Sequence, residues 1–365
     1  MLTPSSVSFV RREFCRGETH HLGRAFWCDS ILIALVLLLP LWSECRAGSI
    51  EMPRIRIGIL GTSVTQSMVK IAEEDNLFQK NGIKAEIVHI TAGPVVAIQA
   101  LLRGDLEFAM SGGTVFVTAR LQGNDVLAVG AFTHIPAYPI VTTKSINKPA
   151  DFKGKVGGDI GSGTTPAVIL KVILRSWGLD PEKDVTLISF SQQSDKGVLA
   201  AMMNGQIQFG IFNGPPWNFE AEKIGFKTYA KVSDLGILPR DIISPLIAKG
   251  DYVRKNPKIV ESVVRSVIEA NSVYHQNKGH AIDVLQKFQG VKDRNTVEQA
   301  YEYYKPYFEK SFRITPQEVE ATLAEVLNAN AQLKNKTDAA NPNEFIHMDA
   351  INKIESSQWF KELKF

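Results

Sequence analysis

The chain has 365 residues, of which 44% are hydrophobic and 22% are charged, and its formal net charge is +3. This is an ordinary globular composition, and the length suffices for two domains. The sequence contains no basic run and no basic stripe with interleaved aromatic residues. Composition and charge therefore argue against a partner that is a nucleic acid or a membrane surface.

The first 47 residues are typical of a signal peptide. Several arginines precede an apolar run at 31–39, which is shorter than the span of about 20 residues that crosses a bilayer. Its length fits the apolar core of roughly 7–15 residues in a secretory signal. Ala47 and Gly48 offer small residues for cleavage after Ala47. We therefore expect export to the periplasm.

The leader leaves several alternatives open. The apolar run could act as an uncleaved membrane anchor, Cys45 could mark a lipoprotein, or Arg11 and Arg12 could belong to a twin-arginine signal. A start codon further downstream would shorten the leader. All three cysteines lie in this segment, at positions 15, 28 and 45, so a chain cleaved after Ala47 has no thiol to mispair in an oxidising compartment.

From Pro53 the sequence alternates strand and helix, which is typical of a parallel sheet covered on both faces. We expect strands at 55–59, 84–90, 106–110 and 126–132, with helices at 64–74, 94–103 and 115–121 between them. Thr62 and Ser63 can cap the first helix, and Pro94 suits the first position of the second helix. An extended segment at 138–143 then leaves this first lobe.

A second α/β lobe is expected after a polar entry at 151–155. Strands are predicted at 156–159, 185–190, 207–212 and 226–231, with Thr165 as N-cap and Pro166 as first residue of the helix that ends at Gly178. The strand at 242–248 returns to the first lobe. Helices at 257–276, 281–288, 295–307 and 316–328 follow. The predicted organisation is a signal peptide at 1–47, lobe 1 at 53–143, lobe 2 at 144–241, and the return with the C-terminal helices at 242–365.

The same local event recurs along the chain. Strands end in Gly, Ser, Thr, Asn or Gln at the start of a helix, at 61–63, 91–93, 111–114, 161–165, 191–193 and 213–217. In parallel α/β sheets, ligands bind beyond the carboxyl ends of the strands. Free N–H groups and the helix dipole favour anionic or acceptor-rich groups at such places. Two facing lobes would form a cleft lined by backbone donors and small polar side chains.

Several stretches resemble the substrate-binding proteins of ABC uptake transporters, in the group of nitrate, sulfonate and taurine binders and THI5/NMT1-like proteins. The matching stretches include 71–82, Gln99-Ala100-Leu101-Leu102-Arg103-Gly104-Asp105-Leu106-Glu107-Phe108-Ala109, 151–157 and 177–181, within a resemblance that runs from about Ile55 to about Tyr307. The resemblance implies a type II periplasmic-binding-protein fold: two α/β lobes, a hinge crossed twice, and closure driven by ligand.

The resemblance also implies the ligand-binding positions. They fall on the strand-end loops, namely Thr62, Ser63, Gly93, Ser111, Gly112, Gly113, Thr114, Gly161, Ser162, Gly163, Thr164, Thr165, Gln192, Asn213 and Trp217. Several relatives carry an acidic residue near the last of these loops, where this chain reads Asn213-Gly214-Pro215-Pro216. We therefore expect a site without charge that binds through backbone donors and hydroxyls, and that does not favour an amino-sulfonate.

Single residues are open to a structural or a functional interpretation. Trp217 could stack on a planar ligand or pack beside the prolines, and His134 is better explained as a polar loop residue than as a ligand contact. Asp159 is interpreted as a surface carboxylate at a strand end. The stretch at 161–164 lacks the lysine and spacing of a phosphate loop. His275 and His280 do not suggest a metal site, and we expect no cofactor.

The sequence predicts an exported solute-binding protein that takes a sulfonate, a nitrate-like anion, a pyrimidine or an aromatic acid to an ABC permease. A monomer is expected. No nucleophile with an adjacent base is visible, so reversible binding is favoured over catalysis. An enzyme of the same fold, of the pyrimidine-synthesising or menaquinone-pathway type, and a ligand-sensing receptor are the alternatives.

Overall fold

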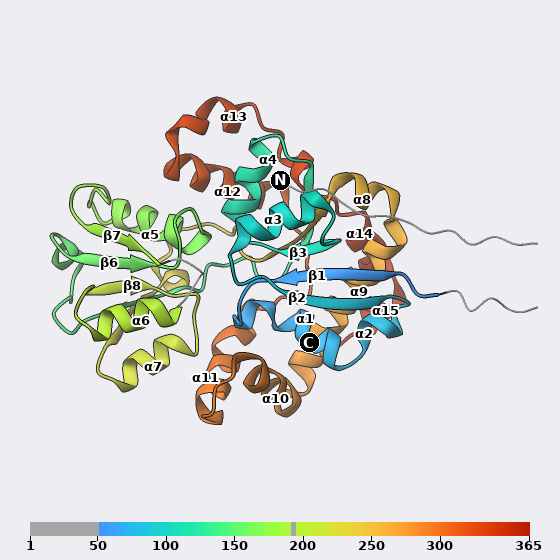
Figure 1. Cartoon of the computed structure of the whole chain (residues 1–365), viewed down its shortest axis with the longest axis horizontal. Helices are drawn as coiled ribbons and strands as arrows, with labels where there is room; N and C mark the ends of the chain where they lie inside the picture. Colours follow the sequence, from blue (N-terminus) through green and yellow to red (C-terminus); the bar gives the residue numbers. More distant parts are fainter. Residues whose placement is uncertain (1–50, 191–194) are drawn as a thin grey trace, which may run out of the picture. The chain divides into compact units, whose positions relative to one another are not determined.

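The computed structural model describes residues 51–190 and 195–365. The predicted signal peptide and Gln192 lie outside the described residues. Within the described part, the strands form two sheets of five strands each (Figure 1). No helix in this part of the chain is both long and apolar enough to cross a membrane.

The first sheet holds strands in the order β2 (Lys84–His89), β1 (Arg54–Ile59), β3 (Phe108–Met110), β10 (Pro245–Lys249) and β4 (Val126–Ala131). Strand β1 pairs in parallel with β2 and β3, whereas β10 pairs antiparallel with β3 and β4. The sheet is therefore mixed and not purely parallel as the alternation of elements predicted. Strand β10 runs against the others because the chain re-enters this lobe from the second one.

The second sheet has the order β7 (Thr186–Ser189), β6 (Val156–Asp159), β8 (Phe209–Ile211), β5 (Pro139–Thr142) and β9 (Lys227–Lys231). Here β5 is the antiparallel strand, paired with β8 and β9. The predicted first lobe, 53–143, included β5, but the strand pairs with the second sheet and so belongs to the second lobe. Both the crossing segment and the strand are extended, so no local signal separates them. We place the lobe boundaries at the crossings 132–138 and 236–244.

Helices cover both faces of each sheet (Figure 1). In the first half of the chain they are α1 (Ser67–Glu74), α2 (Leu77–Lys80), α3 (Pro94–Arg103), α4 (Gly113–Leu121), α5 (Thr165–Ser176), α6 (Asp195–Met203) and α7 (Trp217–Lys223). Pro94 begins α3 as predicted. In the second half they are α8 (Gly250–Lys255), α9 (Pro257–Gln276), α10 (Lys278–Gln289), α11 (Arg294–Tyr304), α12 (Pro316–Ala329), α13 (Lys334–Asp338), α14 (Asp349–Ser356) and α15 (Gln358–Glu362).

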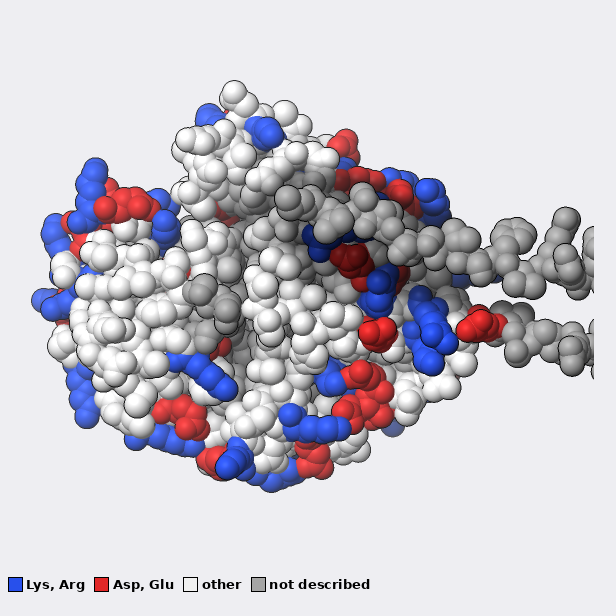
Figure 2. Space-filling model, in the orientation of Figure 1, with Lys and Arg blue, Asp and Glu red and all other residues white. Residues whose placement is uncertain are grey.

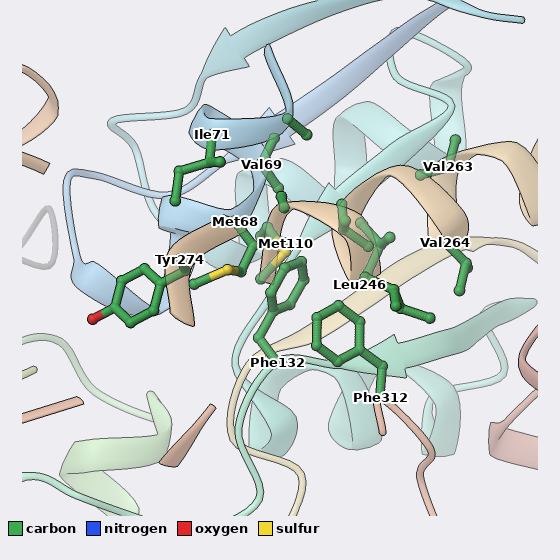
Figure 3. Close-up of a cluster of buried hydrophobic side chains, with 14 of the residues drawn as sticks. Met68, Val69, Ile71, Met110, Phe132, Leu246, Val263, Val264, Tyr274 and Phe312 are labelled. Carbon is green, nitrogen blue, oxygen red and sulfur yellow. The ribbon is translucent and has the colours of Figure 1, made fainter. Parts of the chain in front are cut away.

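One core cluster joins the C-terminal helices to the first lobe. Met68 of α1, Met110 of β3, Leu246 of β10 and Val264 of α9 are all nearly inaccessible to solvent and share this cluster (Figure 3). Phe132 meets Phe312 at 5.0 Å between ring centroids. Each such side chain contributes roughly 1.5–3 kcal/mol by leaving water, so the first sheet and α9 form one packed body.

The charged side chains show no large patch of one sign on the face drawn in Figure 2. Blue and red residues alternate around its border, and the middle is mostly uncharged. This distribution agrees with the small net charge of the chain.

Candidate functional site

A pocket of about 290 Å³ opens between the two lobes, at the strand ends where the sequence predicted a cleft. Its wall is built from strand-end loops, from helix starts and from both crossing segments. The lining residues are Leu60, Gly61, Thr62, Ser63, Thr65, Gln66, Ile90, Thr91, Pro94, Ser111, Gly112, Val115, Tyr138, Thr164, Thr165, Pro166, Asp195, Lys196, Asn213, Pro215, Pro216, Trp217, Ile243 and Ser244.

The turn after β1 forms the first wall of the pocket. Ser63 is the N-cap of the 3₁₀ helix Val64–Gln66, and its Oγ accepts a hydrogen bond from the Thr65 N–H at 3.4 Å. The Gln66 side chain folds back and accepts from the Leu60 N–H. Both bonds hold the strand end against the helix start, which positions the predicted residues Thr62 and Ser63 at the pocket.

The loop between β3 and α4 brings the first lobe into contact with the second. Ser111 and Gly112 line the pocket. A Cβ on Gly112 would come within 2.8 Å of Thr165 Oγ1, so a glycine permits this approach. Thr114 Oγ1 lies 3.2 Å from Thr165 Oγ1 and donates to the Gly163 carbonyl at 3.1 Å. The starts of α4 and α5 therefore touch across the lobe boundary.

The second-lobe loop begins α5 one residue earlier than predicted. Thr164 is the N-cap and Thr165 the first helical residue. The Thr164 side chain does not cap the helix but donates to the Gly161 carbonyl at 2.7 Å. Thr165 is free to face Thr114, which explains why the hydroxyl expected to cap the helix serves as an interlobe contact.

Six of the predicted positions do not line this pocket. Thr114, Ser162 and Gly163 line a separate cavity of about 630 Å³ between α5 and α12. Gly113 packs against the Ile242 carbonyl, and Gly93 and Gly161 line neither cavity. A loop at a helix start has two sides, and the residue pattern does not say which side faces the interlobe pocket; a ligand contact at these six positions stays a prediction.

The pocket is not free of charged residues as the sequence predicted, because Asp195 and Lys196 belong to its lining. Asp195 begins α6 and is 8% exposed. Its Oδ1 accepts the Asn213 N–H at 2.8 Å. Burial raises the pKa of Asp195 to about 7, although the hydrogen bonds from Asn213 lower it in part. A carboxyl group is thus available at the Asn213 turn after all.

The Asn213–Trp217 turn supplies the opposite wall. Trp217 lines the pocket and also packs against the core on the α6 side, which confirms the packing interpretation; stacking on a planar ligand stays a prediction. The Lys196 Nζ lies 5.0 Å from the Trp217 ring centroid, a cation–π distance. This pair places one positive charge at the pocket beside an aromatic face.

The hinge residues divide between the pocket and the interior. Tyr138 of the first crossing and Ser244 of the second line the pocket. His134 does not: its side chain is 1% exposed, and Nδ1 lies 3.0 Å from Glu318 Oε1. Asp159 is 2% exposed and accepts from the Gly161 N–H and from Ser189 Oγ, so its interpretation as a surface carboxylate was wrong.

The pocket residues that the sequence missed had partial signals. Asp195 and Lys196 follow the predicted strand-end loop at 191–193 by two and three residues, in the first turn of α6. Tyr138 and Ser244 belong to the crossings, whose pairing is long-range and leaves no local pattern.

Two mixed α/β sheets, two chain crossings and a pocket between the lobes are the features of a type II periplasmic-binding-protein fold. The model of the NMT1/THI5-like family matches residues 66–279, more than half of the chain. The chain belongs to this family.

Relatives of known sequence are named only as binding proteins. One from Brucella abortus (strain 2308) is 25% identical over 248 residues, which cover 67% of this chain and 75% of that protein. YtlA of Bacillus subtilis is 21% identical over 259 residues, which cover 69% of this chain and 75% of that protein.

Solved structures share the fold. The alkanesulfonate-binding protein SsuA of Xanthomonas axonopodis pv. citri, bound to MOPS, superimposes with a TM-score of 0.68 at 20% identity and covers 82% of this chain and 99% of its own. SsuA of Escherichia coli has a TM-score of 0.64 at 20% identity and covers 79% and 94%.

Proposed function

We propose that this chain is an exported solute-binding protein that captures a small anionic molecule in the interlobe pocket and delivers it to an ABC permease. The observation that carries the proposal is the pocket itself, which combines helix starts from both lobes with a lysine. Its wall is shared between lobes, so a bound molecule would contact both and favour their closed arrangement.

The ligand class follows from the donors at the pocket. Helices α4 and α5 begin at the pocket, where the positive ends of their dipoles favour negative charge. Lys196 adds a cation at the Trp217 face. Hydroxyls of Thr62, Ser63 and Ser111 can donate further hydrogen bonds. We infer an anion of modest size with an apolar or planar body, since the cavity is about 290 Å³.

Sulfonates are the first compounds to test. The Xanthomonas relative is described as an alkanesulfonate-binding protein bound to MOPS. Asp195 places a carboxyl group next to Asn213, where the sequence predicted none. Amino-sulfonates are therefore candidate ligands as well, beside nitrate-like anions, pyrimidines and aromatic acids. A protonated Asp195 could also donate a hydrogen bond to an acceptor on the ligand.

Reversible binding without turnover is part of the proposal. Among the described lining residues there is no histidine to activate a serine or threonine. The nearby His134 is held against Glu318 in the interior. A receptor role would use the same binding step and differ only in the partner.

A thermal-shift screen of the five compound classes tests the proposal, because a ligand that binds the folded state raises the melting temperature by mass action. Isothermal titration calorimetry then measures the affinity. Thr62→Ala combined with Ser111→Ala should weaken binding more than about tenfold, equal to about 1.4 kcal/mol. Ser356→Ala, an exposed serine of α14, is the matched control.

Three outcomes would overturn parts of the proposal. An unchanged affinity in the double variant would remove the pocket as the site. A product detected by mass spectrometry after incubation with the bound compound would replace binding by catalysis. Retention of the full-length chain in the cytoplasm, measured by osmotic-shock fractionation, would contradict export.

A further inference from the structure

The two chain crossings lie side by side and form the hinge. The Asp241 N–H donates to the His134 carbonyl at 2.8 Å, and the Phe132 N–H donates to the Ser244 carbonyl at 3.1 Å. The Ile243 N–H adds a third bond, to Thr133, at 3.3 Å. Any change in the angle between the lobes must bend this ladder.

Helix α12 packs over the hinge and contacts both lobes. It lies against α4 of the first lobe and α5 of the second. Its C-terminal Asn328 carbonyl accepts from Arg175 of α5 at 3.0 Å. Thr322, in the middle of α12, donates to Asp241 Oδ1 on the second crossing. The helix is therefore tied to the hinge through Asp241.

Asp241 meets a second buried carboxyl group, that of Glu325 on α12. Asp241 is 0% exposed and Glu325 is 4% exposed. The two carboxyl groups lie within hydrogen-bond reach of each other. Yet Asp241 Oδ2 and both Glu325 oxygens have no donor among the described residues. Two ionised carboxylates that face each other can only accept hydrogen bonds. A proton on one of them would supply the missing donor.

The charged groups around the Asp241–Glu325 pair contact other carboxylates. Arg240 pairs with Glu309 at 2.6 Å and with Glu318 at 3.1 Å. His134 faces Glu318 as well. Burial would raise the pKa of Glu318, but the hydrogen bond and charge of His134 and the bonds from Thr315 outweigh it and lower the pKa to about 2.

Glu318 is thus the carboxylate that contacts both Arg240 and His134. Its negative charge further disfavours ionisation of Asp241. On the pocket side the phenol of Tyr138 also interacts with the pair, and its pKa is raised by burial and by the charges of Asp241 and Glu325. None of these neighbours supplies a cation to the Asp241–Glu325 pair.

A metal ion does not replace the missing proton. Within residues 51–190 and 195–365, no group of three or more His, Cys, Asp or Glu side chains is arranged to hold one. Removing an ionised carboxylate from water without a partner costs several kcal/mol. A proton is the one cation that fits between two facing carboxyl groups.

We propose that Asp241 and Glu325 share one proton, and that this proton ties α12 to the second crossing, so that loss of the proton loosens the hinge. With the proton present, one carboxyl group donates a charge-assisted hydrogen bond to the other. Without it, two buried like charges face each other across the α12–hinge contact and repel. The lobe angle seen here would then lose one of its supports.

The direction of the pH dependence follows from the raised folded-state pKa values. Burial raises the pKa of Asp241, and burial together with the charge of Asp241 raises that of Glu325. Unfolded carboxyls titrate near pH 4. The stabilisation is therefore complete below about pH 4 and is lost as the pH rises through the folded-state pKa values.

Infrared spectroscopy detects the proton directly. The test uses Asp195→Asn as the parent chain, because Asp195 is a second buried carboxyl with a raised pKa. We expect a protonated-carboxyl C=O band at neutral pH that shifts in D₂O. Asp241→Asn and Glu325→Gln each supply an amide donor, so the band should disappear in both. Its absence from the parent at about pH 6, where the proton should still be bound while free carboxyls are ionised, would overturn the proposal.

Hydrogen exchange measured by mass spectrometry tests the hinge. In the parent, protection of peptides spanning 240–246 and 316–329, corrected for the intrinsic rate, should fall at least roughly tenfold between about pH 6 and 9, the effect of one proton over one pH unit. The peptide 257–276 of α9 is the internal reference. Either amide variant should remove this loss of protection. If a variant fails to fold, the infrared band of the parent chain still tests whether the proton is present.

Glu320→Gln, an exposed change on the same helix, is the matched control. It should keep both the band and the pH-dependent loss of protection. An equal loss of protection in the parent, the control and both amide variants would show that the hinge does not respond to this proton. Loss of the response on removing metals with a chelator would assign the pair to an ion instead.

Discussion

The Tyr304 hydroxyl donates a hydrogen bond to the Asn213 carbonyl, which joins the core of the first lobe to the pocket wall of the second. The Asn213 N–H in turn donates to Asp195 at 2.8 Å. Gly214 permits the contact, because its φ is +136° and a Cβ there would lie 2.4 Å from the Tyr304 hydroxyl. One tyrosine of α11 thus positions both Asn213 and, through it, Asp195.

Tyr304→Phe should weaken ligand binding about three- to tenfold, mainly through faster dissociation. The loss reflects one part-buried hydrogen bond, worth about 1 kcal/mol, that joins the pocket wall of the second lobe to the first. Stopped-flow fluorescence with the ligand found in the screen separates the rates. Tyr274→Phe is the control, since its hydroxyl donates to Tyr301 at 3.1 Å within the core. If Tyr304→Phe and Tyr274→Phe change the affinity equally, the Tyr304 hydrogen bond stabilises the fold but has no specific role in binding.

The neighbouring glycines Gly112 and Gly113 should respond differently to alanine. In Gly112→Ala the new Cβ would meet Thr165 Oγ1 across the lobe boundary at 2.8 Å, so affinity should fall while stability changes little. In Gly113→Ala it would lie 1.7 Å from the Ile242 carbonyl, a backbone atom that cannot yield. That change should cost about 3 kcal/mol or more in denaturant unfolding.

A double variant checks the cause assigned to Gly112. Thr165→Ala removes the oxygen that the new methyl group meets, so Gly112→Ala with Thr165→Ala should bind no more weakly than Thr165→Ala alone. Additive losses would mean that the two lobes do not approach each other as closely in solution.

The local pattern predicted elements well where propensity and packing agree. The helix Pro257–Gln276 and the strand Val156–Asp159 have the predicted limits, because their apolar residues and end signals point to the same element. The short helix Lys334–Asp338 was missed, since five residues are too few to show a helical period. The antiparallel strand Pro139–Thr142 was misassigned, because its partners lie about seventy to ninety residues away.

The pocket was predictable in part for the same reason. Thr62, Ser111 and Asn213 follow strand ends, and parallel strands present those ends at one edge of a sheet. The orientation of each loop depends on the other lobe, however, which is why Thr114 faces a different cavity. Asp195 was not predicted, because it is the first residue of α6 and lies beyond the strand-end pattern.

Asp195→Asn should flatten the pH dependence of stability between about pH 4 and 7. The folded-state pKa of Asp195 is raised to about 7, so its stabilisation is present below its unfolded pKa, near 4, and is lost as the pH rises through 7. Three pKa units correspond to roughly 4 kcal/mol at most. Urea denaturation at several pH values measures the difference, and Asp338→Asn, an exposed change on α13, is the control.

Lys196→Met should weaken the binding of an anionic ligand about tenfold, whereas Lys196→Arg should retain most of the affinity. Methionine keeps the apolar stem over the Trp217 ring but removes the charge, while arginine keeps both the charge and the ring contact. Calorimetry at two salt concentrations checks the origin, because screening should weaken the parent more than the methionine variant. Lys171→Met, at a lysine paired with Glu182 at 2.8 Å outside the pocket, should leave the affinity unchanged. Equal affinity of Lys196→Met and the parent would exclude Lys196 from binding and leave the helix starts and hydroxyls as the groups that select the anion.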